Sequence, residues 1–233
     1  MSKRTEGRRR VVIEAVKPEV DGGLFPIKRI VDDRVMVEAD VFADGHDSLS
    51  CMLKYRKEED REWMETPMQL VVNDRWRGEF TVHELGRYLY TVEAWVDRFK
   101  SWRGDFVKRV EAGQEVSVEL KVGAELIEEA STRAPGADAR RLQEWAGALR
   151  KEGKNSSRSV PLVLDDEMAR LIEKYPDRRF STVYAKELIV VVDRKQARFS
   201  TWYEMFPRSC AVEPGKHATF KDCEQRLDYI ASM

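Results

Sequence analysis

The sequence predicts a mainly β fold with an α insertion: a β-sandwich interrupted by a helical bundle and followed by the start of a βα unit. Three observations carry this prediction. Apolar and polar residues alternate through much of the first hundred positions, helical spacing replaces this alternation after Gly113, and a β-branched run returns at 187–192. The simplest account of the returning run is a strand that rejoins the sandwich, so the helices are expected to be inserted within the β domain.

Each strand of the expected sandwich is bounded by a turn signal. Residues 35–42 alternate with a period of two, and Asp44-Gly45 marks the turn before an extended stretch from 49 to 56. Asn73-Asp74 separates 70–72 from 75–80 as in a hairpin, and Gly86 precedes the strongest strand, 87–96. Strands at this spacing predict an immunoglobulin-like β-sandwich over residues 10–112.

The expected insertion spans residues 113–183. Apolar residues at helical spacing predict helices around 142–149 and over 164–175, where Pro176 ends the last one. A further helix is expected over about 116–131, although Gly123 disfavours it. Gly153–Ser159 is polar and is expected to be a linker, and three such helices can bury their apolar stripes as a small bundle. The return strand is assigned to 184–197, and the continuous apolar run from Leu188 to Val192 is typical of a strand buried on both faces.

The C-terminal segment predicts one strand and one helix. Trp202–Ser209 reads as an extended aromatic strand, and a loop follows from Cys210 to Ala218. Thr219 can cap a helix whose apolar stripe includes Cys223 and Leu227. Such a βα unit normally requires a following parallel strand.

The bulk composition excludes several classes of function. The chain has 233 residues, of which 42% are hydrophobic, and its 41 basic and 42 acidic side chains nearly cancel. A balanced charge gives no electrostatic case for nucleic acid or an anionic membrane as partner. No apolar run approaches the roughly 18 residues of a membrane helix, and no secretory signal is expected after the basic tail at residues 1–9.

The cysteines and histidines indicate neither a disulfide framework nor a metal site. Both sets are widely scattered along the chain: Cys51, Cys210, Cys223, His46, His83 and His217. An odd number of separated cysteines is typical of free thiols in a reducing cytoplasm. Metal sites need paired ligand spacing, so we expect no metal, no cofactor and a cytoplasmic location.

The segment WYEMFPRS resembles the first barrel strand of an alpha-amylase superfamily subgroup that carries a Tyr-x-x-(Phe/Tyr)-Pro-Arg-Ser pattern. Upstream, RVVIEAVKPEVDGGLFPIKR, FADGHD, NDRWRGEF, GRYLYTVEAWVD and SWRGDFVKRVEAGQ resemble the maltosyltransferases that build α-1,4-glucan from maltose 1-phosphate. The similarity runs from Arg10 to Met233. One departure is Ala218, which stands where that family usually has Gly before Thr-Phe.

The resemblance implies that residues 198–233 are the first strand and helix of a (β/α)8 barrel, truncated here. It also implies a glycosyltransferase that moves maltosyl units to the non-reducing end of a glucan with retention, through an Asp nucleophile and a Glu acid/base. Those carboxylates sit about 5–5.5 Å apart in retaining enzymes. In this superfamily they come from later barrel strands, so we expect no catalytic residue and no activity from this chain. The resemblance also implies a homodimer through the sandwich and bundle.

Three residues are candidates for substrate binding: Arg208, Ser209 and Trp102. Arg208 and Ser209 would lie at the C-terminal end of the barrel strand, where such barrels place their sites. For Arg208, holding a carboxylate or a loop is favoured over contact with the phosphate. Trp102 is expected to be an exposed platform for sugar stacking, whereas Trp95 is expected in the core. Glu204 is expected as a hydrogen-bonded residue inside the barrel.

Two function classes therefore remain open from the sequence. One is the scaffold and dimerisation region of a maltosyltransferase. The other is a stand-alone carbohydrate-binding or protein-interaction β-sandwich module without enzyme activity. The second is disfavoured because an independent module has no reason to end on a single βα unit whose apolar faces would stay uncovered.

Overall fold

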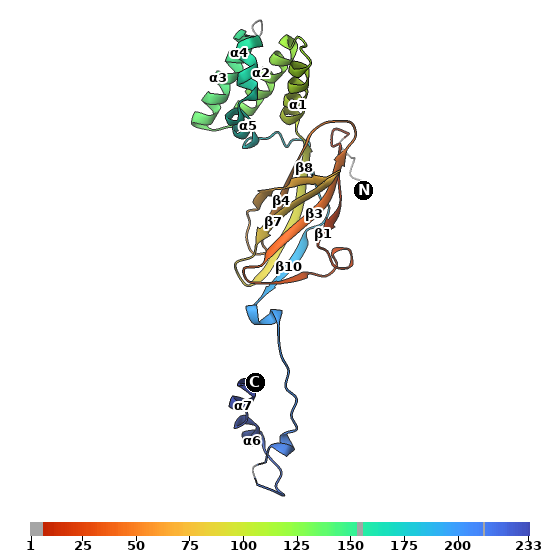
Figure 1. Cartoon of the computed structure of the whole chain (residues 1–233), viewed down its shortest axis with the longest axis vertical. Helices are drawn as coiled ribbons and strands as arrows, with labels where there is room; N and C mark the ends of the chain where they lie inside the picture. Colours follow the sequence, from red (N-terminus) through yellow and green to blue (C-terminus); the bar gives the residue numbers. More distant parts are fainter. Residues whose placement is uncertain (1–6, 153–155, 212) are drawn as a thin grey trace. The chain divides into compact units, whose positions relative to one another are not determined.

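The structure, a computed structural model, describes residues 7–152, 156–211 and 213–233 (Figure 1). It divides into two compact units, Met1–Asp193 and Arg194–Met233. Lys3 and Arg4 of the predicted tail and residues 153–155 of the predicted linker lie outside the described residues. Within the described ranges, no helix is long and apolar enough to cross a membrane.

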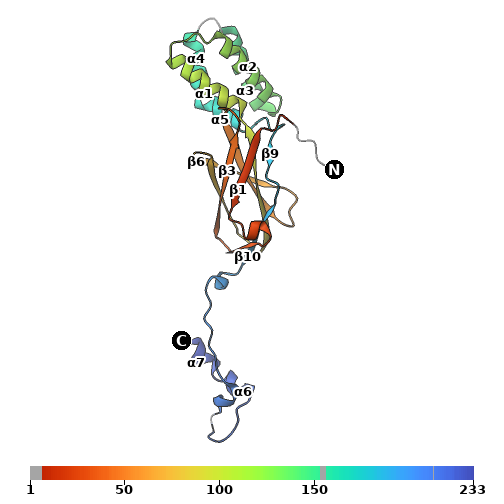
Figure 2. The ribbon, with the colours of Figure 1, turned by 90° about the vertical axis from the view of Figure 1, so that its right-hand side faces the viewer.

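The first unit contains a four-stranded and a six-stranded sheet (Figures 1 and 2). The smaller sheet has the order β1 (Val11–Lys17), β3 (Arg34–Ala43), β7 (Arg75–Thr81) and β6 (Gln69–Val72). The larger has the order β2 (Ile27–Ile30), β10 (Leu188–Asp193), β8 (Gly86–Val96), β4 (Leu49–Lys57) and β5 (Met64–Pro67), with β9 (Thr182–Val183) also paired to β8. Only the β2–β10 pair is parallel among the pairings described.

The two sheets share one buried core. Val35 and Val37 come from the smaller sheet, Leu53 and Val92 from the larger, and all four are fully buried. In β3 the buried side chains alternate with exposed or half-buried ones, which confirms the period of two read from the sequence. Burial of these branched side chains, at about 25 cal/mol per Å² of apolar surface, is the main force that holds the sheets together.

The turns fall where the sequence predicted them. Val72 pairs with Arg75 across the Asn73-Asp74 turn, and Asn73 has a φ of 50°, a left-handed conformation that asparagine tolerates. Gly86 has a φ of 124°, which strains any residue with a Cβ, and it opens β8 as expected. These turns set the register of β7 and β8 against their neighbours.

Five helices follow β8 in the chain: α1 (Arg98–Glu111), α2 (Ser117–Ser131), α3 (Gly136–Glu152), α4 (Ser156–Leu164) and α5 (Asp166–Glu173). Three of them, α2, α3 and α5, were predicted from the sequence. The helices begin at Arg98 and not after Gly113, because Asp97 caps α1 by accepting a hydrogen bond from Lys100 N at 2.9 Å. The described end of the predicted linker, from Ser156, is helical and opens α4.

The helices leave and rejoin the larger sheet at one place. The chain departs after Val96 of β8 and returns through β9, where Thr182 pairs with Ala94 of β8.

The expectation that the return strand is buried on both faces was wrong. Leu188, Val190 and Val192 are buried while Ile189 and Val191 are only half-buried, because just one face of β10 meets the core.

The second unit contains short helical turns: η2 (Lys195–Arg198), η3 (Pro207–Cys210), α6 (Phe220–Glu224) and α7 (Leu227–Ala231). The predicted cap is confirmed, since Asp222 accepts hydrogen bonds from both the backbone and the hydroxyl of Thr219. The predicted single helix is interrupted at Gln225–Arg226. The strand predicted at 202–209 is not formed in this structure, because a strand requires hydrogen bonds to a neighbour and this segment has no strand partner among the described residues.

Candidate functional site

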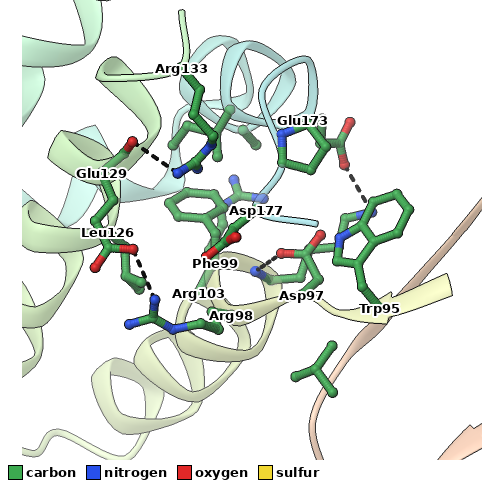
Figure 3. A pocket seen from close by; sticks show the side chains of 15 residues that line it. Trp95, Asp97, Arg98, Phe99, Arg103, Leu126, Glu129, Arg133, Glu173 and Asp177 are labelled. Atoms are coloured by element: carbon green, nitrogen blue, oxygen red, sulfur yellow. Dashed lines mark hydrogen bonds and ion pairs between the residues drawn. The ribbon is translucent and has the colours of Figure 1, made fainter. Parts of the chain in front are cut away.

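A small cavity lies where the helices meet the end of β8, within the first unit (Figure 3). Its volume is about 130 Å³. The lining residues come from β8, α1, α2, α5 and the segments next to them. They include four acidic and four basic side chains beside the apolar Trp95 and Phe99: Asp97, Glu129, Glu173, Asp177, Arg98, Lys100, Arg103 and Arg133. We call this region the joint.

Asp97 connects the sheet to the first helix. One carboxylate oxygen caps α1, and the other accepts a hydrogen bond from Ser50 Oγ of β4 at 2.7 Å. Lys100 donates to the same Ser50 oxygen at 3.1 Å and forms an ion pair with Glu173 of α5 at 3.2 Å. Through these contacts, Asp97 and Lys100 connect β4, α1 and α5 to one another.

Arg133 connects two helices across the cavity. Its Nε donates to the carbonyl of Tyr175 at 2.9 Å and its Nη1 to the carbonyl of Glu129 at 2.9 Å. Burial lowers the pKa of Arg133 from its usual value, but a guanidinium stays charged at neutral pH. Arg98 pairs with the Glu129 carboxylate at 2.9 Å, so α1 and α2 are also joined here.

Arg178 fastens the second connection, the segment between α5 and β9. Its guanidinium binds Glu65 of β5 through two hydrogen bonds of 2.8 and 2.9 Å, and it lies 4.5 Å from the centre of the Trp95 ring. Glu93 of β8 lies 3.5 Å from the same guanidinium. Glu93 is only 6% exposed and also accepts hydrogen bonds from Lys54 at 3.0 Å and Ser181 at 2.6 Å.

The joint has the properties of a structural connection. Glu65 and Glu93 are a close pair of carboxylates, which could suggest acid–base chemistry. A general acid needs a raised pKa, however, and the hydrogen bonds from Arg178 lower the pKa of Glu65. The cavity is also smaller than the roughly 300–1,000 Å³ of typical ligand pockets.

The three predicted binding residues belong to two different units. Arg208 and Ser209 are adjacent and exposed on η3, and Ser209 borders a hollow of about 250 Å³ with Tyr203 and Tyr229. Trp102 belongs to the other unit. The expectation that Trp102 is an exposed platform was wrong: it is 9% exposed, its Nε1 donates to Glu119 O at 2.8 Å, and it packs between Phe99 and Phe106.

Two further expectations concern Trp95 and Glu204. Trp95 is 3% exposed, which confirms its place in the core. Glu204 is exposed in this structure, where the strand expected around it has no neighbour in the described part of the chain.

Sequence reasoning missed the joint itself. Asp97 stands three residues before Lys100 and directly precedes the spacing Phe99, Trp102, Phe106, which is a helix-start signal that was available. No local signal could reveal Arg178, because its partner Glu65 is 113 positions away.

The fold and the joint define a class: a β-rich domain in which helices are joined by hydrogen bonds and ion pairs to the end of a two-sheet core. A family model described as "alpha-1,4-glucan:maltose-1-phosphate maltosyltransferase, domain N/S" matches residues 9–194. The chain belongs to the alpha-1,4-glucan:maltose-1-phosphate maltosyltransferase family, as the resemblance predicted.

Curated relatives carrying that name agree along almost the whole chain. The protein from Chlorobaculum tepidum is 44% identical over 228 residues, covering 98% of this chain and 34% of its own length. The protein from Myxococcus xanthus is 43% identical over 237 residues, covering 98% and 35%. The protein from Methylacidiphilum infernorum is 38% identical over 230 residues, covering 98% of this chain and 34% of its own length. The chain therefore spans about a third of the length of these relatives.

Proposed function

We propose that this chain is the N-terminal scaffold and dimerisation region of a glycosyltransferase. The whole enzyme would transfer maltosyl units from maltose 1-phosphate to the non-reducing end of α-1,4-glucans with retention. The observation that carries this proposal is the extent of the similarity: relatives named for that reaction align with 98% of the chain, including its second unit, yet are about three times as long as the chain.

The proposed domain division follows from this. The two sheets form an immunoglobulin-like sandwich, the helices form a bundle inserted between β8 and β9, and residues 198–233 form the first βα unit of a (β/α)8 barrel. The helical part starts at Arg98 in this division, because α1 packs with the other helices in one apolar cluster.

The surface of the second unit supports a barrel partner. Its large apolar side chains are mostly exposed, with Trp202 at 93% and Phe220 at 83%; Phe199, Phe206 and Tyr229 are also exposed. Exposed apolar patches of this kind mark surfaces that pack against other protein. Further barrel strands and helices are the proposed occupant.

The chemistry is proposed to come from carboxylates outside this chain. Retention requires two carboxyl groups about 5–5.5 Å apart with distinct roles. Arg208 and Ser209 are proposed to stand beside that site, at the C-terminal end of the first barrel strand. Trp102 has no place in the proposal, since its ring is enclosed by helices.

A chimaera tests the scaffold role. The first third of the Chlorobaculum tepidum relative, the part that aligns here, is replaced by this chain, and phosphate release from maltose 1-phosphate is measured with glycogen as acceptor. We expect transfer within about tenfold of the parent relative, and no transfer from this chain alone or from the relative without its first third. An inactive but folded chimaera, or turnover by this chain alone, would contradict the proposal.

The same material distinguishes the alternative module. A stand-alone carbohydrate-binding domain would be retarded in a native gel that contains glycogen, whereas the proposed scaffold migrates as it does without glycogen. Retardation of this chain at low glycogen concentration, together with an inactive chimaera, would establish the alternative.

Dimerisation is proposed to use the sandwich and the bundle. Val118 and Val122 of α2 lie one helical turn apart, and their side chains are exposed, at 65% and 42%. We expect a dimer by light scattering and a shift to monomer in Val118→Glu/Val122→Glu. Lys121→Glu, at an exposed position of the same helix, is the matched control. A monomer at high concentration of the unchanged chain contradicts the dimer.

A further inference from the structure

Two of the three cysteines are buried next to the same turn of the second unit. Cys210 is 4% exposed and ends η3, while Cys223 is 6% exposed and lies in α6. The Cys210 Sγ lies 3.5 Å from the Phe206 carbonyl, and the Cys223 Sγ lies 3.9 Å from the Pro207 carbonyl. Both thiols therefore approach consecutive carbonyls of one backbone turn, although residues 211–222 separate them in sequence.

The two sulfurs are near each other through these two carbonyls. Burial is the main cause that raises the pKa of Cys223, and a hydrogen bond with the Cys210 thiol adds to it. Both cysteines are free in this structure. Cys210 also borders the hollow of about 250 Å³ lined by Tyr203, Phe206 and Tyr229.

We propose that Cys210 and Cys223 are a reversible oxidation site that closes into an intramolecular disulfide. With glutathione disulfide as oxidant, the thiolate of one cysteine attacks it, the glutathione S–S bond breaks and one glutathione leaves. The thiolate of the other cysteine then attacks the mixed disulfide and releases the second glutathione. Two protein thiols and one glutathione disulfide give one protein disulfide and two glutathione thiols.

Closure has a defined structural consequence. It joins η3, which carries Arg208 and Ser209, covalently to the first turn of α6. The turn and the helix are then held together by a bond as well as by packing. The inference does not rest on the proposed function, since it needs only the second unit of this chain.

The intact chain provides its own control. Cys51 is buried in the sheet core and is the only cysteine among residues 1–193, so it has no disulfide partner within its own unit. After incubation with glutathione disulfide, quenching in acid and titration of thiols in denaturant, we expect the count to fall from three to one. Dithiothreitol should restore it to three.

Peptide mapping assigns the bond. Trypsin releases Cys210 in the peptide Ser209–Lys216 and Cys223 in Asp222–Arg226. We expect these two peptides cross-linked, with Cys51 recovered as a thiol. In Cys210→Ala we expect a glutathione adduct on Cys223 and no cross-link. The proposal is overturned if both thiols stay alkylatable in the intact chain, if each carries a separate glutathione, or if the cross-link joins two chains or involves Cys51.

Discussion

The two units of the chain differ in how far they bury their apolar side chains. In the first unit, apolar residues form two enclosed clusters, one between the sheets and one among the helices. In the second unit, Cys210 and Cys223 are the buried residues among those described, while its large aromatic residues are exposed. Because hydrophobic burial is the dominant favourable contribution to folding, the first unit carries the means of its own stability and the second depends on packing elsewhere.

The largest expected contrast comes from truncating one apolar side chain in each unit. Leu53→Ala removes a fully buried side chain between the sheets and should lower the free energy of unfolding by about 4 kcal/mol. Trp202→Ala removes a ring that is 93% exposed and should change the free energy by less than about 0.5 kcal/mol. Urea denaturation followed by circular dichroism measures both changes. Equal losses in the free energy of unfolding would contradict the expected difference between the two units.

Two glycines sharpen the comparison within the helical part. A Cβ at Gly123 of α2 would lie 2.0 Å from Cζ2 of Trp102, so Gly123→Ala should lower the free energy of unfolding by about 3 kcal/mol. A Cβ at Gly147 of α3 meets nothing within 4 Å, so Gly147→Ala should be neutral or stabilising by up to about 1 kcal/mol. Urea midpoints of the two variants make the test. If Gly123→Ala is as stable as Gly147→Ala, the Trp102 ring does not pack against Gly123 as closely as the structure indicates.

The joint predicts a smaller effect. Arg178→Ala removes the cation between Glu65 and the buried Glu93, and we expect a loss of about 2 kcal/mol in the free energy of unfolding. Arg87→Ala breaks an ion pair with Glu58 at 2.8 Å whose partners are both nearly half exposed, and it should cost less than about 0.5 kcal/mol. Thermal denaturation compares them. Equal shifts in Tm would mean that Arg178 does not fasten the helices.

The smallest expected effect is a pH dependence at the joint. A hydrogen bond from Arg179 lowers the pKa of Asp177 from 3.8 to about 2. Because the folded pKa lies below the unfolded one, the stabilisation is complete above about pH 4 and is lost as the pH falls through about 2. We expect Asp177→Asn to flatten this part of the stability profile, measured by urea midpoints between pH 5 and pH 2. An unchanged acid profile in Asp177→Asn would contradict the assignment.

The sequence correctly predicted those features of the fold that are set by residues close together in the chain. The alternation in β3, the turn at Asn73 and the apolar spacing of α3 are properties of neighbouring residues, and the structure has all three. Helix α1 was not predicted, although Asp97 is a recognisable N-cap residue in the sequence. Because the helix was not predicted, the burial of Trp102 within it was not predicted either.

The rest could not be read from neighbours in the sequence. The clamp at the joint pairs Arg178 with Glu65 across 113 positions, and only the fold brings them together. The expected strand at 202–209 failed for a related reason. A strand is completed by the hydrogen bonds of a neighbouring strand, and the structure offers this segment none in its described residues.

Hydrogen–deuterium exchange, compared between the two units, tests most directly whether the second unit depends on a partner for its packing. In the isolated chain, the account predicts slow exchange for the amides of β8 and β10 and fast exchange for those of α6 and α7. In the chimaera with the remaining two thirds of the Chlorobaculum tepidum relative, α6 and α7 should become protected. Protection of α6 and α7 in the isolated chain equal to that of β8, or no gain in the chimaera, would contradict it.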